Sequence, residues 1–352
     1  MSRRRLLVIA AIAIVLAAAF AAHLSLGSVP IPLGQTLRAL IGAPVQNETW
    51  RTIVLDFRLP RAVTAAIAGA ALAVGGLLMQ TLFRNPLAGP FVLGINAGAS
   101  LGVAIVVLGG SLLGSAPVAG SGLLAGAGIG GDALLVLAAS TGAAAVLLVV
   151  LAVARRVESA MTLLVLGVLF SYAVSAGVSV LMHFSIPQEI QTYINWTFGS
   201  FAGVDRPQLG LLAAAVGIGL ASTVLLVKPL NALLLGEAYA SSMGVRVRVV
   251  RTLVIAATAL LAGTVTAFCG PIAFVGIAVP HLARALLRDA DHRRLMPATL
   301  LLGAVTAVVA DLVASLPGLR IVLPLNAVTA LIGAPIVIAV IVRRGDLGGE
   351  FS

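Results

Sequence analysis

Long apolar stretches separated by short polar segments are the feature that most constrains how this chain can fold. Ten of them approach the roughly 20 residues that a helix needs to cross bilayer hydrocarbon. The predicted spans cover residues 6–26, 63–82, 91–109, 133–154, 160–182, 209–227, 252–269, 272–287, 297–316 and 324–342. A backbone in hydrocarbon must satisfy its hydrogen bonds internally, so these stretches predict an all-α, polytopic membrane protein.

The composition excludes an ordinary soluble domain, since 60% of the 352 residues are hydrophobic and 10% are charged. The formal charge of +10 comes from basic residues scattered between apolar runs, which argues against a nucleic-acid-binding surface. A single cysteine, Cys269, excludes an internal disulfide and a multi-cysteine metal site. The first apolar run follows three arginines, as in a signal peptide, but it exceeds the typical core of roughly 7 to 15 residues, so we expect a retained helix.

Ten spans return both termini to one side, and the basic residues indicate which side. With cytoplasmic termini, 16 of the 22 Lys and Arg residues fall inside, in agreement with the positive-inside rule. The inner residues are Arg3, Arg4, Arg5, Arg84, Arg155, Arg156, Lys228, Arg246, Arg248, Arg251, Arg284, Arg288, Arg293, Arg294, Arg343 and Arg344. The other 6 are Arg38, Arg51, Arg58, Arg61, Arg206 and Arg320.

The segment 228–251 joins two spans and is too charged to lie in hydrocarbon. Its leucines have the spacing of a short amphipathic helix, and a break near Gly236 precedes another helical turn. The pattern predicts a segment on a membrane face. It leaves open whether the segment is a plain connecting loop or a docking surface.

Four further segments carry expectations. Residues 33–41 have the pattern of an interfacial helix, and Pro60, between Arg58 and Arg61, is expected to stop the preceding structure and start a helix. The two arginines either anchor the chain at the interface or pair with carboxylates of a docking protein. Gly69, Ala73 and other small residues of span 63–82 predict close helix packing. Residues 109–131 predict a flexible loop.

Four blocks resemble the FecCD-type permease family, which serves bacterial ABC importers for iron chelates, haem and cobalamin. They are residues 58–100, the coupling segment within 228–251, residues 270–297 and residues 323–335. In the third block, Pro280-His281 is expected to end a short helix. The resemblance implies a type II ABC importer permease fold, with about ten transmembrane helices in a single domain over residues 1–352. It also implies a homodimer in the bacterial inner membrane and a short external helix at about 187–203.

The resemblance further implies three groups of functional residues. The expected ATPase-coupling residues are Leu230, Asn231, Leu235, Gly236, Glu237, Ala238, Ala240, Gly244, Val245, Pro280, His281 and Arg284. The expected docking residues for a periplasmic or lipid-anchored substrate-binding protein are Arg58, Arg61 and Arg320. The expected translocation path includes Met182, His183, Gln191, Asn195, Trp196, Leu325, Asn326 and Thr329. Val322, Asn326 and Ser315 depart from the family pattern, so the resemblance does not extend to the detailed outer-mouth contacts or to a narrow substrate assignment.

The energy for transport is expected to come from a partner. Lys228, the only lysine, follows Val227, so the chain has no P-loop; ATP and Mg²⁺ are expected in two copies of a separate ATPase subunit. The expected cargo is an iron complex, either a ferric siderophore or haem, with cobalamin as the alternative. An ion-coupled secondary transporter would need intramembrane ionisable groups, and Asp311 is the one clear carboxylate within a predicted span. His183 is a lone histidine at a helix end, and His281 and His292 lack partners at metal-ligand spacing, so no metal site is expected.

Overall fold

The computed structural model describes residues 3–112, 131–154, 156–157, 160–315 and 322–343, and every regular element in these ranges is helical. Among the described residues, seven helices are long and apolar enough to cross a membrane, and three shorter apolar helices coincide with the remaining predicted spans. The predicted all-α fold is confirmed. Most of the predicted loop 109–131 lies outside the described residues, while residues 109–112 continue a helix.

Contacts group the chain into two compact units, residues 1–77 with 272–352 (unit 1) and residues 78–271 (unit 2). Unit 1 contains both ends of the chain. Its helices are α1 (Arg3–Ser25), α2 (Leu33–Leu40), α3 (Glu48–Thr52), η1 (Ile53–Arg58), the first part of α4 (Leu59–Leu82), α12 (Val275–Leu287), α13 (His292–Ala314) and α14 (Leu325–Arg343). The expectation of one permease domain over the whole chain stays a prediction.

Unit 2 contains the other helices, and they are consecutive in sequence. They are the end of α4, α5 (Ile95–Leu112), α6 (Gly131–Ala154), α7 (Ala160–Phe184), α8 (Pro187–Thr197), α9 (Arg206–Leu233), α10 (Glu237–Ser242) and α11 (Val247–Cys269). Within the unit, α11 packs on α5, α6 and α9, and α5 packs on α6, α7 and α8.

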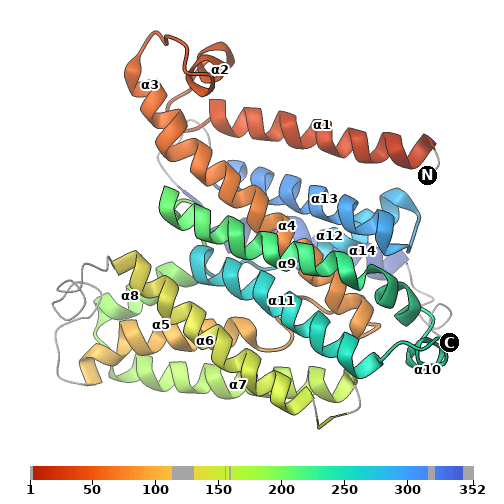
Figure 1. The fold of residues 1–352 in the computed structure, drawn as a ribbon. Coiled ribbons are helices and arrows are strands. Elements are labelled where there is room, and N and C mark those ends of the chain that lie inside the picture. The colour runs from red at the N-terminus through yellow and green to blue at the C-terminus, as the bar shows by residue number, and fades with distance from the viewer. Residues whose placement is uncertain (1–2, 113–130, 155, 158–159, 316–321, 344–352) are drawn as a thin grey trace. The chain divides into compact units, whose positions relative to one another are not determined.

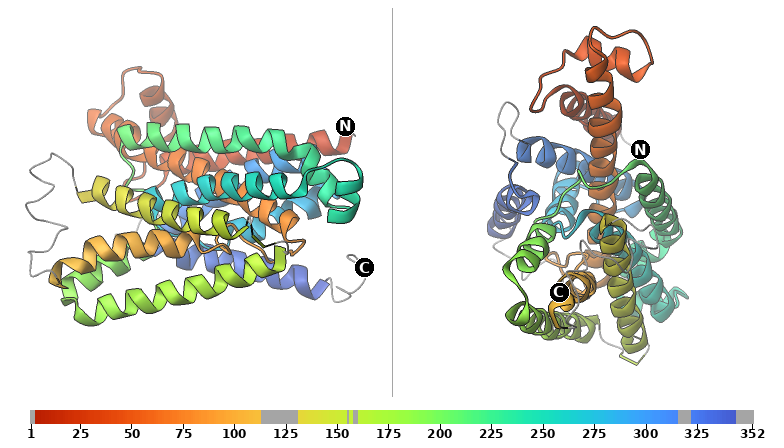
Figure 2. Two further views of the ribbon diagram at one scale, coloured as in Figure 1. Left: turned by 60° about the horizontal axis from the view of Figure 1, so that its bottom comes forward. Right: turned by 90° about the vertical axis from the view of Figure 1, so that its left-hand side faces the viewer.

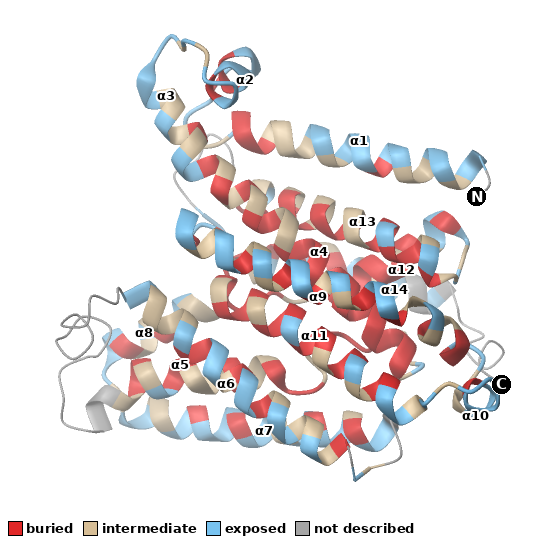
Figure 3. Cartoon of the chain, in the orientation of Figure 1, coloured by how far each residue is buried: buried red, intermediate tan, exposed pale blue. Residues whose placement is uncertain are grey.

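Helix α13 organises unit 1, because α1, α12 and α14 all pack on it. The connection between α1 and α4 lies at one end of α1 and contains the short helices α2 and α3 (Figure 2). Within this connection Ile31, Ala39 and Val54 form a small apolar cluster. Helix α1 is largely exposed along its length (Figure 3), since only 11% of its most apolar part is buried, as expected of a helix whose outer face contacts lipid.

Small residues allow the closest helix contacts, as the sequence predicts. A Cβ added at Gly69 would overlap the carbonyl oxygen of Gly303, and one added at Gly303 would overlap that of Gly69. In unit 2, Gly98 and Gly142 are opposed in the same way, joining α5 to α6. Without a hydrophobic driving force in lipid, such close backbone approach is what holds membrane helices together.

Three predicted helix boundaries are wrong, and two of them were placed at a proline. Pro60 does not separate two elements, since helical structure runs from Glu48 to Leu82 through the π-helical segment η1. The proline ring would meet the carbonyl group four residues earlier in a regular helix, and the wider π-helical turn relieves that conflict. Pro280 lies inside α12, which continues to Leu287. Helix α9 likewise continues past Lys228 and Pro229 to Leu233, because Leu226, Leu230 and Leu233 keep one face buried.

Candidate functional site

The predicted coupling segment in unit 2 begins as the last turns of α9 and continues through α10. Gly236 separates the two helices with φ +104°, a conformation that favours glycine, so the predicted break at this residue is confirmed. Gly244 ends the segment with φ +83°. Two glycine-dependent turns therefore fix the direction of α10.

One face of this segment is buried and the other is exposed. The buried side chains of the segment are those of Leu230, Leu233 and Ala240. The exposed side chains include Leu234, Leu235, Tyr239 and Met243, with Ala238 beside them. We call the residues Leu234, Leu235, Ala238, Tyr239 and Met243 the exposed apolar face. An apolar patch of this kind is typical of a protein interaction site.

Glu237 joins the coupling segment to α11. Its two carboxylate oxygens accept hydrogen bonds from Arg251 Nη2 at 3.0 and 3.2 Å, and Arg251 Nη1 also donates to the Val157 carbonyl at 3.2 Å. Arg251 is buried, whereas the Glu237 side chain is 43% exposed. The pair holds α10 in place while leaving the exposed apolar face uncovered by described residues of unit 2.

The other predicted coupling residues are distributed between the units. In unit 2, Asn231 and Val245 are partly buried, and the Val245 N–H donates to the Ala240 carbonyl at 3.0 Å. In unit 1, Pro280 and His281 are buried within α12 and Arg284 is partly exposed one turn later. The turn after α12 contains Asp289, which bridges Arg5 at 3.1 Å and Arg294 at 2.8 Å.

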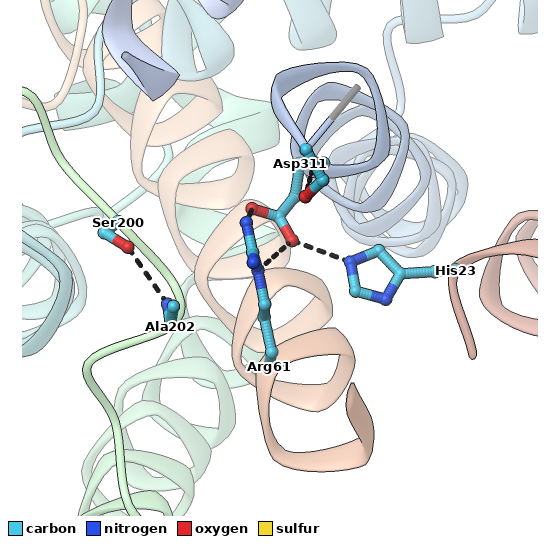
Figure 4. A network of polar contacts seen from close by, with 6 residues as sticks. His23, Arg61, Ser200, Ala202 and Asp311 are labelled. Carbon is cyan, nitrogen blue, oxygen red and sulfur yellow. Dashed lines mark hydrogen bonds and ion pairs between the residues drawn. The ribbon is translucent and has the colours of Figure 1, made fainter. Parts of the chain in front are cut away.

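At the opposite end of unit 1, Asp311 holds three helices together (Figure 4). Arg61 of α4 donates from Nε to Oδ2 at 2.7 Å and from Nη2 to Oδ1 at 2.8 Å, and His23 Nε2 of α1 lies 2.6 Å from Oδ2. Asp311 and His23 are buried. A carboxylate satisfied by a bidentate arginine has its partners inside the protein, as expected of a structural ion pair.

Arg58 is directed into unit 1. Its Nη1 donates to the carbonyls of Leu24 and Ser25 at 2.8 and 2.9 Å, and its Nη2 donates to Val29. Only 9% of the residue is exposed. Two of the three arginines predicted for docking, Arg58 and Arg61, thus have internal partners, and the third, Arg320, lies outside the described residues. Their docking role stays a prediction.

The predicted path residues also fall in both units. In unit 2, His183, Gln191 and Asn195 are exposed, and Met182 and Trp196 are partly buried. In unit 1, Leu325 and Thr329 are buried. Asn326, which departs from the family pattern, accepts a hydrogen bond from the Ala273 N–H at 2.9 Å. Two other residues depart from the family pattern. The Ser315 hydroxyl donates to the Asp311 carbonyl, and Val322 is exposed.

Each unit separates its basic residues as the sequence predicts. In unit 1, Arg5 and Arg294 meet at the Asp289 turn, while Arg58 and Arg61 lie at the other end of α1, near Leu24 and His23. In unit 2, Arg84 lies beside Gly236, and Arg251 contacts both Glu237 and Val157. Which end faces the cytoplasm stays a prediction.

A model of the FecCD transport family matches residues 14–343, nearly the whole chain. The chain belongs to the FecCD transport family. Members named vitamin B12 import system permease protein BtuC are similar to it: one from Klebsiella pneumoniae is 34% identical over 296 residues, covering 84% of each chain. Another, from Escherichia coli, is 36% identical over 292 residues, covering 83% of this chain and 84% of the relative.

A solved structure is also similar to this chain over almost its full length. It is described as an inward-facing conformation of an ABC transporter assigned to the metal-chelate type, and it matches with a TM-score of 0.79 and 27% identity over 95% of this chain and 98% of that chain. This FecCD protein is therefore a multi-pass ABC importer permease, and its fold is that of such permeases. Permeases of this kind work in a dimeric arrangement with a separate ATPase subunit and a substrate-binding protein.

Proposed function

We propose that two copies of this chain form the membrane path of an inner-membrane importer for an iron complex, a ferric siderophore or haem, driven by two copies of the partner ATPase. Both termini face the cytoplasm in this proposal. The observation that carries it is the exposed apolar face of segment 228–251, held in place by Gly236 and by the Glu237–Arg251 pair. A rigid segment that offers an apolar face to a partner suits transmission of force from an ATPase.

The partner residues of Asp311 support ATP-driven over ion-driven transport. An ion-coupled transporter binds its driving ion at an accessible intramembrane group. Here Arg61 and His23 already contact the buried carboxylate. Replacing Arg61 with an entering cation would leave the guanidinium without its partner, at a cost of several kcal/mol.

Cobalamin is the second candidate for the cargo. The relatives at 34–36% identity are named vitamin B12 import permeases, which favours a corrinoid, whereas the similar structure is described as metal-chelate type. Both descriptions are compatible with a bulky metal-containing chelate. Capture of the cargo belongs to the external binding protein in this proposal, so the permease need not bind it tightly.

Reconstitution in proteoliposomes tests both the mechanism and the cargo. The permease, its co-purified ATPase and the binding protein are assayed with ferric siderophore, haem and cobalamin in parallel, with and without internal ATP. We expect uptake of an iron complex that requires both ATP and the binding protein. Uptake of cobalamin alone would replace the iron assignment, and uptake by the isolated chain driven by an ion gradient would refute the ABC mechanism.

A further inference from the structure

A small pocket lies in unit 2 where α8 and α11 end and α6 begins. The cavity has a volume of about 130 Å³. It is lined by Asp132 of α6, Asn195 and Trp196 of α8, Ser200, Cys269 at the end of α11 and Gly270 directly after it. Leu135 and Val136, one turn after Asp132 on the same face of α6, also line it. Pockets for drug-sized ligands occupy about 300–1,000 Å³. This cavity is therefore suited to the end of one side chain or to a group of similar size.

Close backbone contacts fix the walls of the pocket. The Ser200 N–H donates to the Cys269 carbonyl at 2.8 Å, and the Ser200 hydroxyl accepts from the Ala202 N–H at 3.1 Å (Figure 4). Gly270 has φ +71°, and a Cβ there would lie 2.6 Å from the Trp196 carbonyl oxygen. The end of α11 is thus held against the end of α8.

Trp196 is held by a second aromatic ring. The Tyr193 ring stacks on it with centroids 6.3 Å apart and an interplanar angle of 29°. Tyr193 is itself buried, and burial raises the pKa of its phenol, partly offset by a hydrogen bond with the Ser100 side chain. The indole is therefore positioned before any ligand arrives.

The charge distribution of the pocket favours a cation. Both α8 and α11 end here, and a helix C-terminus carries partial negative charge. Asp132, in the first turn of α6, adds an acidic side chain to the lining. The ion pairs among the described residues do not include Asp132, and residues 113–130 contain no ionisable side chain that would neutralise it. The indole ring provides a π-face suited to an ammonium or guanidinium group.

We propose that this pocket binds the ammonium or guanidinium group of a lysine or arginine side chain on the substrate-binding protein. The inference rests on the proposed function, because it requires an external binding protein at the end of unit 2 that contains Trp196. The size of the cavity favours a single side chain over an entire metal chelate. Asp132 would pair with the cation, and Trp196 and Asn195 would complete the site.

The preference for cations is measured first, without any partner. Ser200 is exposed, so Ser200→Cys in a Cys269→Ala background places the only thiol of the chain at the pocket. Its reaction rate with cationic aminoethyl methanethiosulfonate is compared with the rate for the anionic sulfonatoethyl reagent. We expect Asp132→Asn to lower the cation-to-anion ratio about three- to five-fold, as the loss of one charge a few ångströms away predicts.

Glu48→Gln is the matched control, since it also removes one negative charge, from a side chain that does not line the pocket. It should leave the ratio unchanged. A ratio that is insensitive to Asp132→Asn overturns the proposal. Size-exclusion chromatography in detergent verifies the folding of each variant, and misfolded variants are excluded. Asp132→Glu retains the negative charge and should therefore keep the preference for the cationic reagent.

The second measurement identifies the source of the cation. Binding protein without substrate should protect the thiol of the Ser200→Cys variant from the reagent, and Asp132→Asn should weaken its affinity about ten-fold. Protection that requires bound substrate would assign the cation to the cargo and overturn the docking proposal. ATP-driven uptake with an affinity that Asp132→Asn does not change would leave the proposed function intact and refute only this inference.

Discussion

Gly76 of α4 lies directly against the carbonyl oxygen of Gly276 in α12, four residues before Pro280. In a regular helix that carbonyl would accept a hydrogen bond from the residue at position 280, and proline has no N–H to donate. The close approach of Gly76 brings its Cα hydrogens to this carbonyl, which has no N–H at position 280 to accept from. Such Cα–H···O contacts recur where helices pack closely. The proline inside α12 is therefore accommodated by a glycine on another helix of unit 1.

Gly76→Ala is expected to destabilise the protein by about 1–3 kcal/mol, because the new Cβ would overlap the Gly276 carbonyl and force the helices apart. The measurement is the thermal unfolding midpoint of the detergent-solubilised protein. Gly217→Ala in α9 is the control, since a Cβ there meets nothing within 4 Å and alanine favours a helix. Equal midpoints for the two variants would contradict the packing described here.

Asp311→Asn is expected to destabilise the protein by about 3–5 kcal/mol, because it leaves Arg61 without its buried anionic partner. ATP-driven uptake per correctly folded molecule should stay close to that of the unaltered protein. The two quantities are measured separately, by denaturation in detergent and by uptake normalised to folded protein. Loss of uptake at unchanged stability, together with a lost proton or sodium dependence, would indicate ion coupling instead.

Leu235→Asp is expected to weaken binding of the ATPase at least ten-fold while changing the unfolding midpoint little. Leu235 is 63% exposed and belongs to the exposed apolar face, so the aspartate is solvated in the free permease but buried in the complex. Affinity is measured with the purified ATPase subunit. Leu225, which is 81% exposed in the middle of α9, provides the matched control Leu225→Ala. Undiminished affinity of the Leu235 variant would place the interface elsewhere.

Glu237→Gln tests the fixed orientation of α10. The change keeps the size of the side chain but removes the charge that accepts two hydrogen bonds from buried Arg251. We expect ATP hydrolysis to continue with reduced uptake per ATP, because α10 would lose its attachment to α11. The ratio of uptake to hydrolysis is measured in proteoliposomes. A ratio equal to that of the unaltered protein would show that the pair does not contribute to coupling.

The ion pairs of Asp289 with Arg5 and Arg294 are expected to lose their stabilising contribution in acid. Burial alone would raise its pKa, but hydrogen bonds from Arg294 and the Asp291 N–H, with the charges of Arg5 and Arg294, lower the pKa below its ordinary value of about 3.9. A lowered pKa means that the stabilisation is present above about pH 4 and is lost as pH falls through the folded-state value. The difference in unfolding midpoint between the unaltered protein and Asp289→Asn should therefore shrink as pH is lowered from 6 to 3. A constant difference would exclude this ion cluster as the cause.

Local sequence determined the ten apolar helices, the separation of basic residues within each unit, the break at Gly236 and the small-residue contacts of Gly69. These follow from hydropathy, charge and glycine content, which depend only on neighbouring residues. Sequence reasoning missed the continuation of helices through Pro60 and Pro280, because a proline reads as a helix end unless its surroundings compensate. It ended the span at residue 227 because the charged segment that follows cannot lie in hydrocarbon. In α12 the compensating contact comes from Gly76, which is distant in the sequence.

Only the tertiary structure decided which charges pair and which polar groups meet. Asp311 contacts His23 and Arg61, which are 288 and 250 residues away, and no local pattern indicates either partner. The pocket beside Trp196 likewise combines the ends of α8 and α11 with the start of α6. Apolar periodicity and charge are properties of a segment and can be read along the chain. Pairing and enclosure depend on the packing of distant segments, and the spacing of residues along the chain does not specify them.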